Sequence, residues 1–136
     1  ISRRAYGETV DIITTQFPFW FAKSLNKYKN AENTMPIDQH QLVAMMAPRP
    51  VYVASATEDK WADPKGELMA LVEASKVYKL FGAQDLPSMD NFTPEKPFHG
   101  DVGYHLRIGK HDITVYDWMN YCDFADKHFG KPKNQL

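Results

Sequence analysis

The chain of 136 residues contains a single cysteine, Cys122, so no disulfide can form within it. Cys122 falls inside a helical pattern of apolar residues, and we expect it to be a small buried apolar side chain. The chain also lacks an apolar run of membrane length and a signal-peptide pattern. We therefore predict no membrane association. In a piece of a longer protein, the missing signal pattern carries no information on secretion.

The chain has no excess of charge of one sign. It contains 16 Lys and Arg and 17 Asp and Glu, so its net charge is −1. The basic residues are scattered along the chain. A nucleic-acid interface needs a clustered basic face, so we predict no nucleic-acid partner. The five histidines show no metal-ligand spacing such as H-E-x-x-H, and we predict no metal.

The chain also lacks a G-x-S-x-G nucleophile elbow, although it contains the other half of the constellation to which such an elbow belongs. The apolar run Val51–Ala56 is followed by an acid, Asp59, and His111 lies on a Gly-flanked loop before the last helical pattern. An acid followed by a histidine is the chain order of α/β-hydrolases, in which the serine comes first. The pattern predicts the C-terminal part of a hydrolase whose nucleophile lies upstream.

What the chain does contain is enough apolar material for a core. Hydrophobic residues make up 43% of it and aromatic residues 13%. Aromatic-rich clefts suit sugar or aryl ligands, but most aromatic side chains simply fill cores. The aromatic content alone therefore does not choose between a binding cleft and a large core.

The order of expected elements favours two successive α/β units on a parallel sheet with right-handed crossovers. Residues Glu8–Gln16 fit either a short helix or an extended run, Phe17–Phe21 reads as a packed loop, and Lys23–Thr34 as polar surface. Further along, we expect a helix capped by Asp38 and ended by Pro48, a central strand over Val51–Ala56, a helix from Pro64, a long loop over Gly82–Gly100, a strand over Val102–Ile108 and a helix over Thr114–Phe129. We treat residues 1–136 as a single segment.

His111 is the candidate general base, because ester attack by serine needs a base that titrates near neutral pH. Its loop follows a strand, and ligands bind α/β proteins at the carboxyl edge of the sheet. Four other histidines compete with it. His40 and His128 read as structural or exposed, His105 as a packing or hydrogen-bonding residue within a strand, and His99 as undecided.

Asp59 is the candidate acid that orients His111, since it follows the apolar strand directly. Two neighbouring acids have other interpretations. Asp63 reads as the cap of the helix that begins at Pro64, and Glu58 as exposed.

Several motifs resemble those of bacterial glucuronoyl esterases, the fifteenth family of carbohydrate esterases, and they extend over nearly the whole chain. They are Ser2-Arg3-Arg4, Asp38-Gln39-His40, the segment from Ala47 to Ala56, Trp61-Ala62-Asp63-Pro64-Lys65-Gly66-Glu67, the segment from Gly103 to Arg107, and Tyr116-Asp117-Trp118.

The resemblance implies an α/β-hydrolase fold and a serine esterase, secreted or periplasmic, that cleaves esters between 4-O-methyl-glucuronate on xylan and lignin alcohols without a cofactor. The family's serine lies on a Gly-Cys-Ser-Arg elbow, in an upstream part of the enzyme that this chain lacks. Trp61 is implied to donate its indole N–H to the glucuronate, and Glu8 to bind sugar hydroxyls. Family members differ in their catalytic acid. If an upstream glutamate serves, Asp59 is secondary.

Other interpretations remain open at this point. Without the resemblance, Trp61 reads as a half-buried packing residue and Glu8 as an acid at a helix start, where the helix dipole favours it. The whole protein could be another α/β-hydrolase, such as an acetyl-xylan esterase or a peptidase. It could also be a carbohydrate-binding relative without a working triad.

Overall fold

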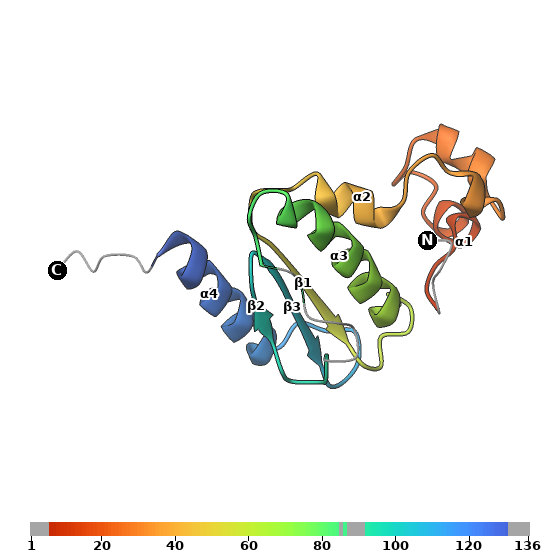
Figure 1. Ribbon diagram of the computed structural model, residues 1–136. Coiled ribbons are helices and arrows are strands. Elements are labelled where there is room, and N and C mark those ends of the chain that lie inside the picture. Colours follow the sequence, from red (N-terminus) through yellow and green to blue (C-terminus); the bar gives the residue numbers. More distant parts are fainter. Residues whose placement is uncertain (1–5, 85, 87–91, 131–136) are drawn as a thin grey trace.

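A computed structural model describes residues 6–84, 86 and 92–130 (Figure 1). A three-stranded sheet has α2 and α3 on one side and α4 on the other, and the N-terminal elements form a lobe beside it. The elements in order are α1 Val10–Gln16, the 3₁₀ helices η1 Lys23–Tyr28 and η2 Glu32–Thr34, α2 Gln39–Ala44, β1 Val51–Ala56, α3 Pro64–Lys79, β2 Phe98–His99, β3 Val102–Arg107 and α4 Val115–Phe129.

The predicted pair of parallel strands is present. β1 runs parallel to β3, with Val51 opposite Val102 and Ala56 opposite Arg107, and α3 makes the crossover between them. The short strand β2 pairs antiparallel with β3 and was not predicted. In the described residues the strand order is β1-β3-β2, so β1 lies at an edge and β3 in the centre. The prediction of a central β1 is therefore not met within this part of the chain.

The helix starts show which capping predictions hold. Asp38 forms a capping box with Gln41 at the start of α2, as predicted. Asp63 does precede α3, but its backbone is left-handed, with φ of 57°, and its side chain makes no capping hydrogen bond. The prediction of Asp63 as a side-chain cap was therefore wrong. Pro64 at the first helical position already removes one of the amides that a cap would serve.

The core lies between α3 and the sheet. Leu71 and Tyr78 of α3 pack with Val102 and Tyr104 of β3, and all four side chains are fully buried or nearly so. Because strand side chains alternate, Gly103 and His105 point to the opposite face, toward α4. A Cβ on Gly103 would lie 2.9 Å from the Phe124 ring, so a glycine here lets α4 approach β3 closely.

The expectation that Cys122 is a buried apolar side chain was wrong. Cys122 is exposed, and so are Val115, Trp118, Met119 and Phe129 on the same side of α4. The sheet is contacted instead by another face of α4, which carries Asp117, Asn120 and Phe124. Periodicity identifies an apolar face but cannot say what covers it.

The loop Phe17–Phe21 is not packed as expected. Phe17 stacks on Trp20 with ring centroids 4.0 Å apart, but Phe19 is 97% exposed and Trp20 is 66% exposed. Lys23–Thr34 lies mostly at the surface, as expected. The motif Ser2-Arg3-Arg4 lies outside the described residues. None of the described helices is both long and apolar enough to cross a membrane.

Candidate active site

The site begins where the loops after β1 and β3 are held together. Thr57 N donates to the carbonyl of Arg107 and Glu58 N to that of Gly109, both at 2.9 Å. Gly109 N donates in return to Thr57 Oγ1 at 3.1 Å. Because β1 and β3 are parallel, both loops leave the same edge of the sheet. These three bonds continue the strand pairing into the loops.

The paired loops bring His111 and Asp59 into contact. Nδ1 of His111 donates to Oδ2 of Asp59 at 2.6 Å, across 52 positions in the sequence. The Asp59 side chain is 10% exposed, whereas that of His111 is 89% exposed. The imidazole is thus held at one nitrogen, and Nε2 on its other side lies open to a reacting group. A carboxylate in this position fixes the tautomer and stabilises the imidazolium form.

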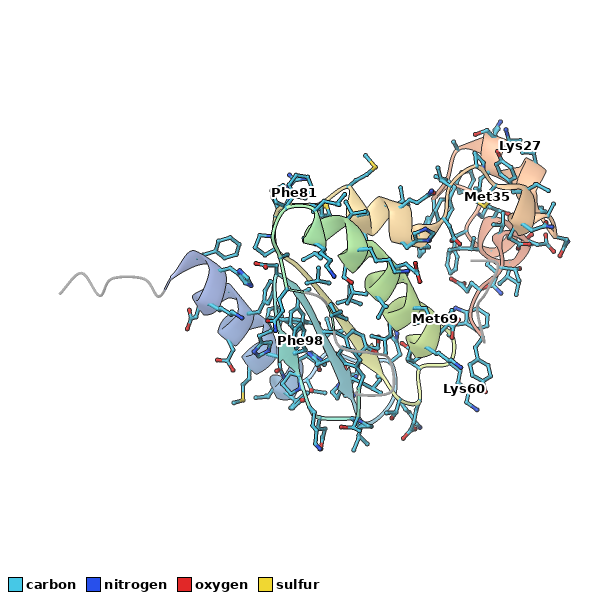
Figure 2. The ribbon with its side chains drawn as sticks, in the orientation of Figure 1. Lys27, Met35, Lys60, Met69, Phe81 and Phe98 are labelled. Atoms are coloured by element: carbon cyan, nitrogen blue, oxygen red, sulfur yellow. The ribbon has the colours of Figure 1, made fainter. Side chains whose placement is uncertain are left out.

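Trp61 follows Asp59 on the same loop and is 55% exposed. Segment 6–8 runs against this loop. A Cβ on Gly7 would lie 3.1 Å from both Trp61 O and Asp63 Cβ, and Gly7 has a φ of +84° that favours glycine. Lys60 lies at this turn (Figure 2), with its ammonium 5.4 Å from the centroid of the Tyr6 ring. Glu8 and Trp61 therefore belong to adjoining segments, although the structure records no contact between their side chains.

The carboxylate of Glu8 borders a cavity of about 760 Å³. Oε1 of Glu8 is buried and has no hydrogen-bond partner among the described residues. The cavity lies between segment 6–8, the start of α2 and the first turns of α3, with His40, Asp63 and Glu67 in its wall. His111, Asp59 and Trp61 do not line it. The His111–Asp59 pair therefore lies outside this cavity.

Glu67 is a polar residue of this region that sequence reasoning missed. It accepts a hydrogen bond of 2.6 Å from Ser55 Oγ at the end of β1. Burial raises the pKa of Glu67, and the negative charges of Asp59 and Asp63 raise it further against the opposing bond from Ser55. Its place at the end of the Trp61–Glu67 motif was the signal that could have identified it.

The other four histidines make different contacts. His105 is fully buried between Tyr52 OH, 3.0 Å from Nδ1, and Asp117 Oδ1, 2.8 Å from Nε2, in agreement with its predicted hydrogen-bonding role. His99 contacts Asn120, and His128 contacts the carbonyl of Gly100. His40 is partly buried at the cavity. His111 thus combines a carboxylate partner with an open ring face.

Sequence reasoning also missed a buried charge cluster around His105. Asp117 accepts from His105 and pairs with Arg107, whose Nε lies 2.9 Å from Oδ2. Burial alone would raise the pKa of Asp117, but two bonds from Thr114, one from His105 and the charge of Arg107 lower it to about 2. Burial lowers the pKa of His105, so a neutral ring donates to Asp117 and accepts from Tyr52. The motifs Gly103–Arg107 and Tyr116–Trp118 contained these residues.

In residues 6–84, 86 and 92–130, no three His, Cys, Asp or Glu side chains are grouped to hold a metal ion. The absence of a metal and of a cofactor stays a prediction.

Parallel strands joined by a helical crossover, with an acid loop and a histidine loop at their carboxyl ends, match the acid and histidine half of an α/β-hydrolase. The family model described as "Glucuronyl esterase, fungi" matches residues 2–82. The chain belongs to the glucuronoyl esterases, carbohydrate esterase family 15.

Relatives of known sequence agree with this assignment. The chain is 50% identical over 128 residues to carbohydrate esterase MZ0003 of an unknown prokaryotic organism. This alignment covers 94% of this chain and 30% of that protein. It is 32% identical over 119 residues to 4-O-methyl-glucuronoyl methylesterase 1 of Wolfiporia cocos. This alignment covers 88% of this chain and 23% of that protein.

Solved structures give the same result. A promiscuous family 15 esterase from a marine bacterial metagenome superposes with a TM-score of 0.87 at 50% identity, over 90% of this chain and 31% of that one. The glucuronoyl esterase from Solibacter usitatus superposes with a TM-score of 0.84 at 46% identity, over 92% of this chain and 32% of that one. The chain therefore spans less than a third of the length of these relatives.

Proposed function

We propose that this chain supplies the histidine and the acid of a serine esterase that cleaves 4-O-methyl-glucuronoyl esters linking xylan to lignin alcohols. The contact of 2.6 Å between His111 and Asp59, with the far side of the ring open, carries the proposal. The name 4-O-methyl-glucuronoyl methylesterase, given to a relative of 32% identity, supports the choice of ester.

In this proposal residues 1–136 form the C-terminal part of one catalytic domain, and the serine comes from an upstream part. The open edge of β1 and the exposed apolar side of α4 are the surfaces which that part would cover. Because a xylan–lignin ester lies outside the cell, the whole enzyme would be secreted or periplasmic.

The reaction proceeds in two halves. Nε2 of His111 takes the proton of the serine hydroxyl while the serine oxygen attacks the ester carbonyl. Asp59 stabilises the imidazolium that forms. The imidazolium then gives this proton to the departing alcohol oxygen, which leaves a glucuronoyl-serine ester. Water attacks this ester with His111 again as base, and the returned proton releases the serine and the free uronic acid.

Trp61 and Glu8 are the proposed sugar contacts. The indole of Trp61 is half exposed two residues from the acid, and the buried carboxylate oxygen of Glu8 accepts no hydrogen bond from any of the described residues. An indole N–H can donate to a uronate oxygen, and a carboxylate can accept from sugar hydroxyls. In support, segment 6–8 adjoins the loop that carries Trp61, and the same loop carries Asp59, which contacts His111.

The test uses a whole-length enzyme that contains this chain, with methyl glucuronate and an acetylated xylose as paired substrates. We expect His111→Ala to lower kcat/KM on methyl glucuronate by about three or more orders of magnitude, because the base is removed. His128→Ala, at a histidine bonded to a backbone carbonyl, is the matched control and should stay near wild type.

Three results would contradict the proposal. Folded His111→Ala that keeps more than a tenth of wild-type activity would remove His111 as the base. Wild-type enzyme that cleaves the acetylated sugar faster than methyl glucuronate would favour an acetyl-xylan esterase. No turnover of either ester by the wild type would favour a carbohydrate-binding protein without catalysis.

A further inference from the structure

The guanidinium of Arg107 uses its donors in two directions. On one side, Nε lies 3.2 Å from Oδ1 and 2.9 Å from Oδ2 of Asp117. On the other, Nη1 donates to the carbonyl of Ile108 at 3.1 Å, and Nη2 donates to the carbonyls of Lys110 and Asp112, each at 2.8 Å. Arg107 itself is 6% exposed. One planar group therefore ties the start of α4 to the loop after β3.

The carbonyls on Nη2 belong to the residues directly before and after His111. The loop is thus bent around the guanidinium with His111 at its apex, pointing away toward Asp59. Gly109 completes the bend with a φ of +120°, and a Cβ at this position would lie 3.0 Å from Nη1 of Arg107. The bend is therefore fitted closely to the arginine.

Asp117 holds the arginine in turn. Its Oδ2 accepts from Thr114 N at 2.6 Å and Thr114 Oγ1 at 2.7 Å, which fixes the first turn of α4. Its Oδ1 accepts from the fully buried His105 of β3. The guanidinium is thus held by the central strand and a helix, both of them rigid elements. Its bonds to the loop carbonyls fix the loop relative to these two elements.

We propose that Arg107 is a positioning residue for His111. Its bonds to the carbonyls of Lys110 and Asp112 set the imidazole against Asp59 and aim Nε2 at the serine. The proposal rests on the role of His111 as general base given above. A misplacement of about 1 Å at a catalytic group can cost roughly a hundredfold in rate, so this constraint should act on kcat.

The simpler explanation is that Arg107 only balances the buried charge of Asp117. A lysine would also balance that charge, but its ammonium is a point donor and cannot reproduce the planar fork. Arg107→Lys therefore separates the two explanations. Arg49→Lys makes the same chemical change before β1, at the other end of the sheet, where the Arg49 side chain is exposed and contacts the carbonyl of Met46.

The first measurement does not depend on activity. In the whole-length enzyme labelled with ¹⁵N-histidine, we expect the wild-type His111 ring to show one tautomer, with Nδ1 protonated toward Asp59. In Arg107→Lys the two tautomers should average and the ring should become mobile, while Arg49→Lys should match the wild type. Unchanged His111 signals in folded Arg107→Lys would overturn the proposal.

The second measurement is kinetic, with methyl glucuronate. We expect Arg107→Lys to lower kcat by about 10- to 100-fold with KM changed less than about twofold, because substrate contacts are intact and only the base is misplaced. Arg49→Lys should have wild-type constants. A rise in KM with kcat unchanged, or a lower kcat with unchanged His111 signals, would also overturn the proposal.

If Arg107→Lys fails to fold, a second pair of variants carries the same test. Asp117→Asn retains the guanidinium that can donate to the loop carbonyls, although without its carboxylate partner, whereas Arg107→Gln in the Asp117→Asn background removes both the guanidinium and the buried charge. The double variant should have the lower kcat and the mobile His111, and equal values in both would overturn the proposal. Full activity in His111→Ala would instead reject the proposed function. The histidine spectra alone would then test whether Arg107 positions the His111 ring.

Discussion

Asp117 shows how one residue joins stability to the site. Its side chain is almost completely buried, yet hydrogen bonds from Thr114 and His105 and the charge of Arg107 hold its pKa at about 2, below the ordinary 3.8. The folded protein therefore binds this proton more weakly than the unfolded chain does. Asp117 thus stabilises the fold above about pH 4, and this contribution is lost as the pH falls from about 4 toward 2.

The prediction concerns the free energy of unfolding of the whole-length enzyme and its Asp117→Asn variant. The difference between them should be constant from pH 7 to 5 and should shrink below about pH 4, because the asparagine has no proton to gain. Urea titrations at pH 6, 5, 4 and 3 measure it, with Asp123→Asn on the exposed side of α4 as control. A difference that is equal at pH 6 and pH 3 would contradict the low pKa.

Among the elements, the loop after β1 holds two candidate functions within three residues. Asp59 faces His111, and its Oδ1 also accepts from Ala62 N at 3.3 Å, which folds the loop back on itself. Trp61 lies within this fold-back and is half exposed. A change at Trp61 can therefore act on the sugar or on the loop, and a test must tell these apart.

Trp61→Phe keeps a ring and removes the indole N–H. If that N–H binds the uronate, kcat/KM for glucuronate esters should fall by about 3- to 100-fold, the range expected for one lost hydrogen bond to a neutral or charged group. Hydrolysis of a small acetyl ester should barely change. Trp118→Phe on α4 is the matched control. An equal fall on both esters would mean that Trp61 shapes the Asp59 loop, and no fall would mean that it packs.

At the scale of the whole molecule, apolar surface remains open on the 136-residue chain. Trp118 and Met119 of α4 are 59% and 62% exposed, and the first four residues of β1 are only partly buried. Contiguous apolar surface of this kind marks interaction sites or a tendency to aggregate. The described sheet has three strands, and β1 has no partner on its outer edge within the described residues.

We expect the isolated chain to bind an apolar dye and to melt without a sharp transition, or to aggregate. Fluorescence of the dye and circular dichroism on heating measure this. The double change Trp118→Ser and Met119→Ser should lower dye binding if the exposed side of α4 is a main site, whereas Lys65→Ser on exposed surface of α3 should not. A sharp two-state melt of the unpartnered chain would contradict the expectation.

The elements and the candidate site were largely predictable from the sequence. The bounds of β1, the capping of α2 by Asp38 and the helix after Pro64 follow from local rules on proline, side-chain caps and apolar runs. The approach of Asp59 to His111 also followed, because the carboxyl ends of parallel strands meet at one edge of a sheet. These features depend on neighbours in the chain or on a single pairing of strands.

What the sequence could not decide depends on which surfaces meet. The same helical pattern in α4 is compatible with a buried or an exposed Cys122, and only the packing of Asp117 and Asn120 toward the sheet chose between them. The ties from Arg107 to the loop around His111 join residues at short separation, yet they require β3, α4 and the loop to be placed together. Local chemistry thus determined the elements and the acid–histidine pair, whereas tertiary packing decided which faces are covered and what holds the histidine in place.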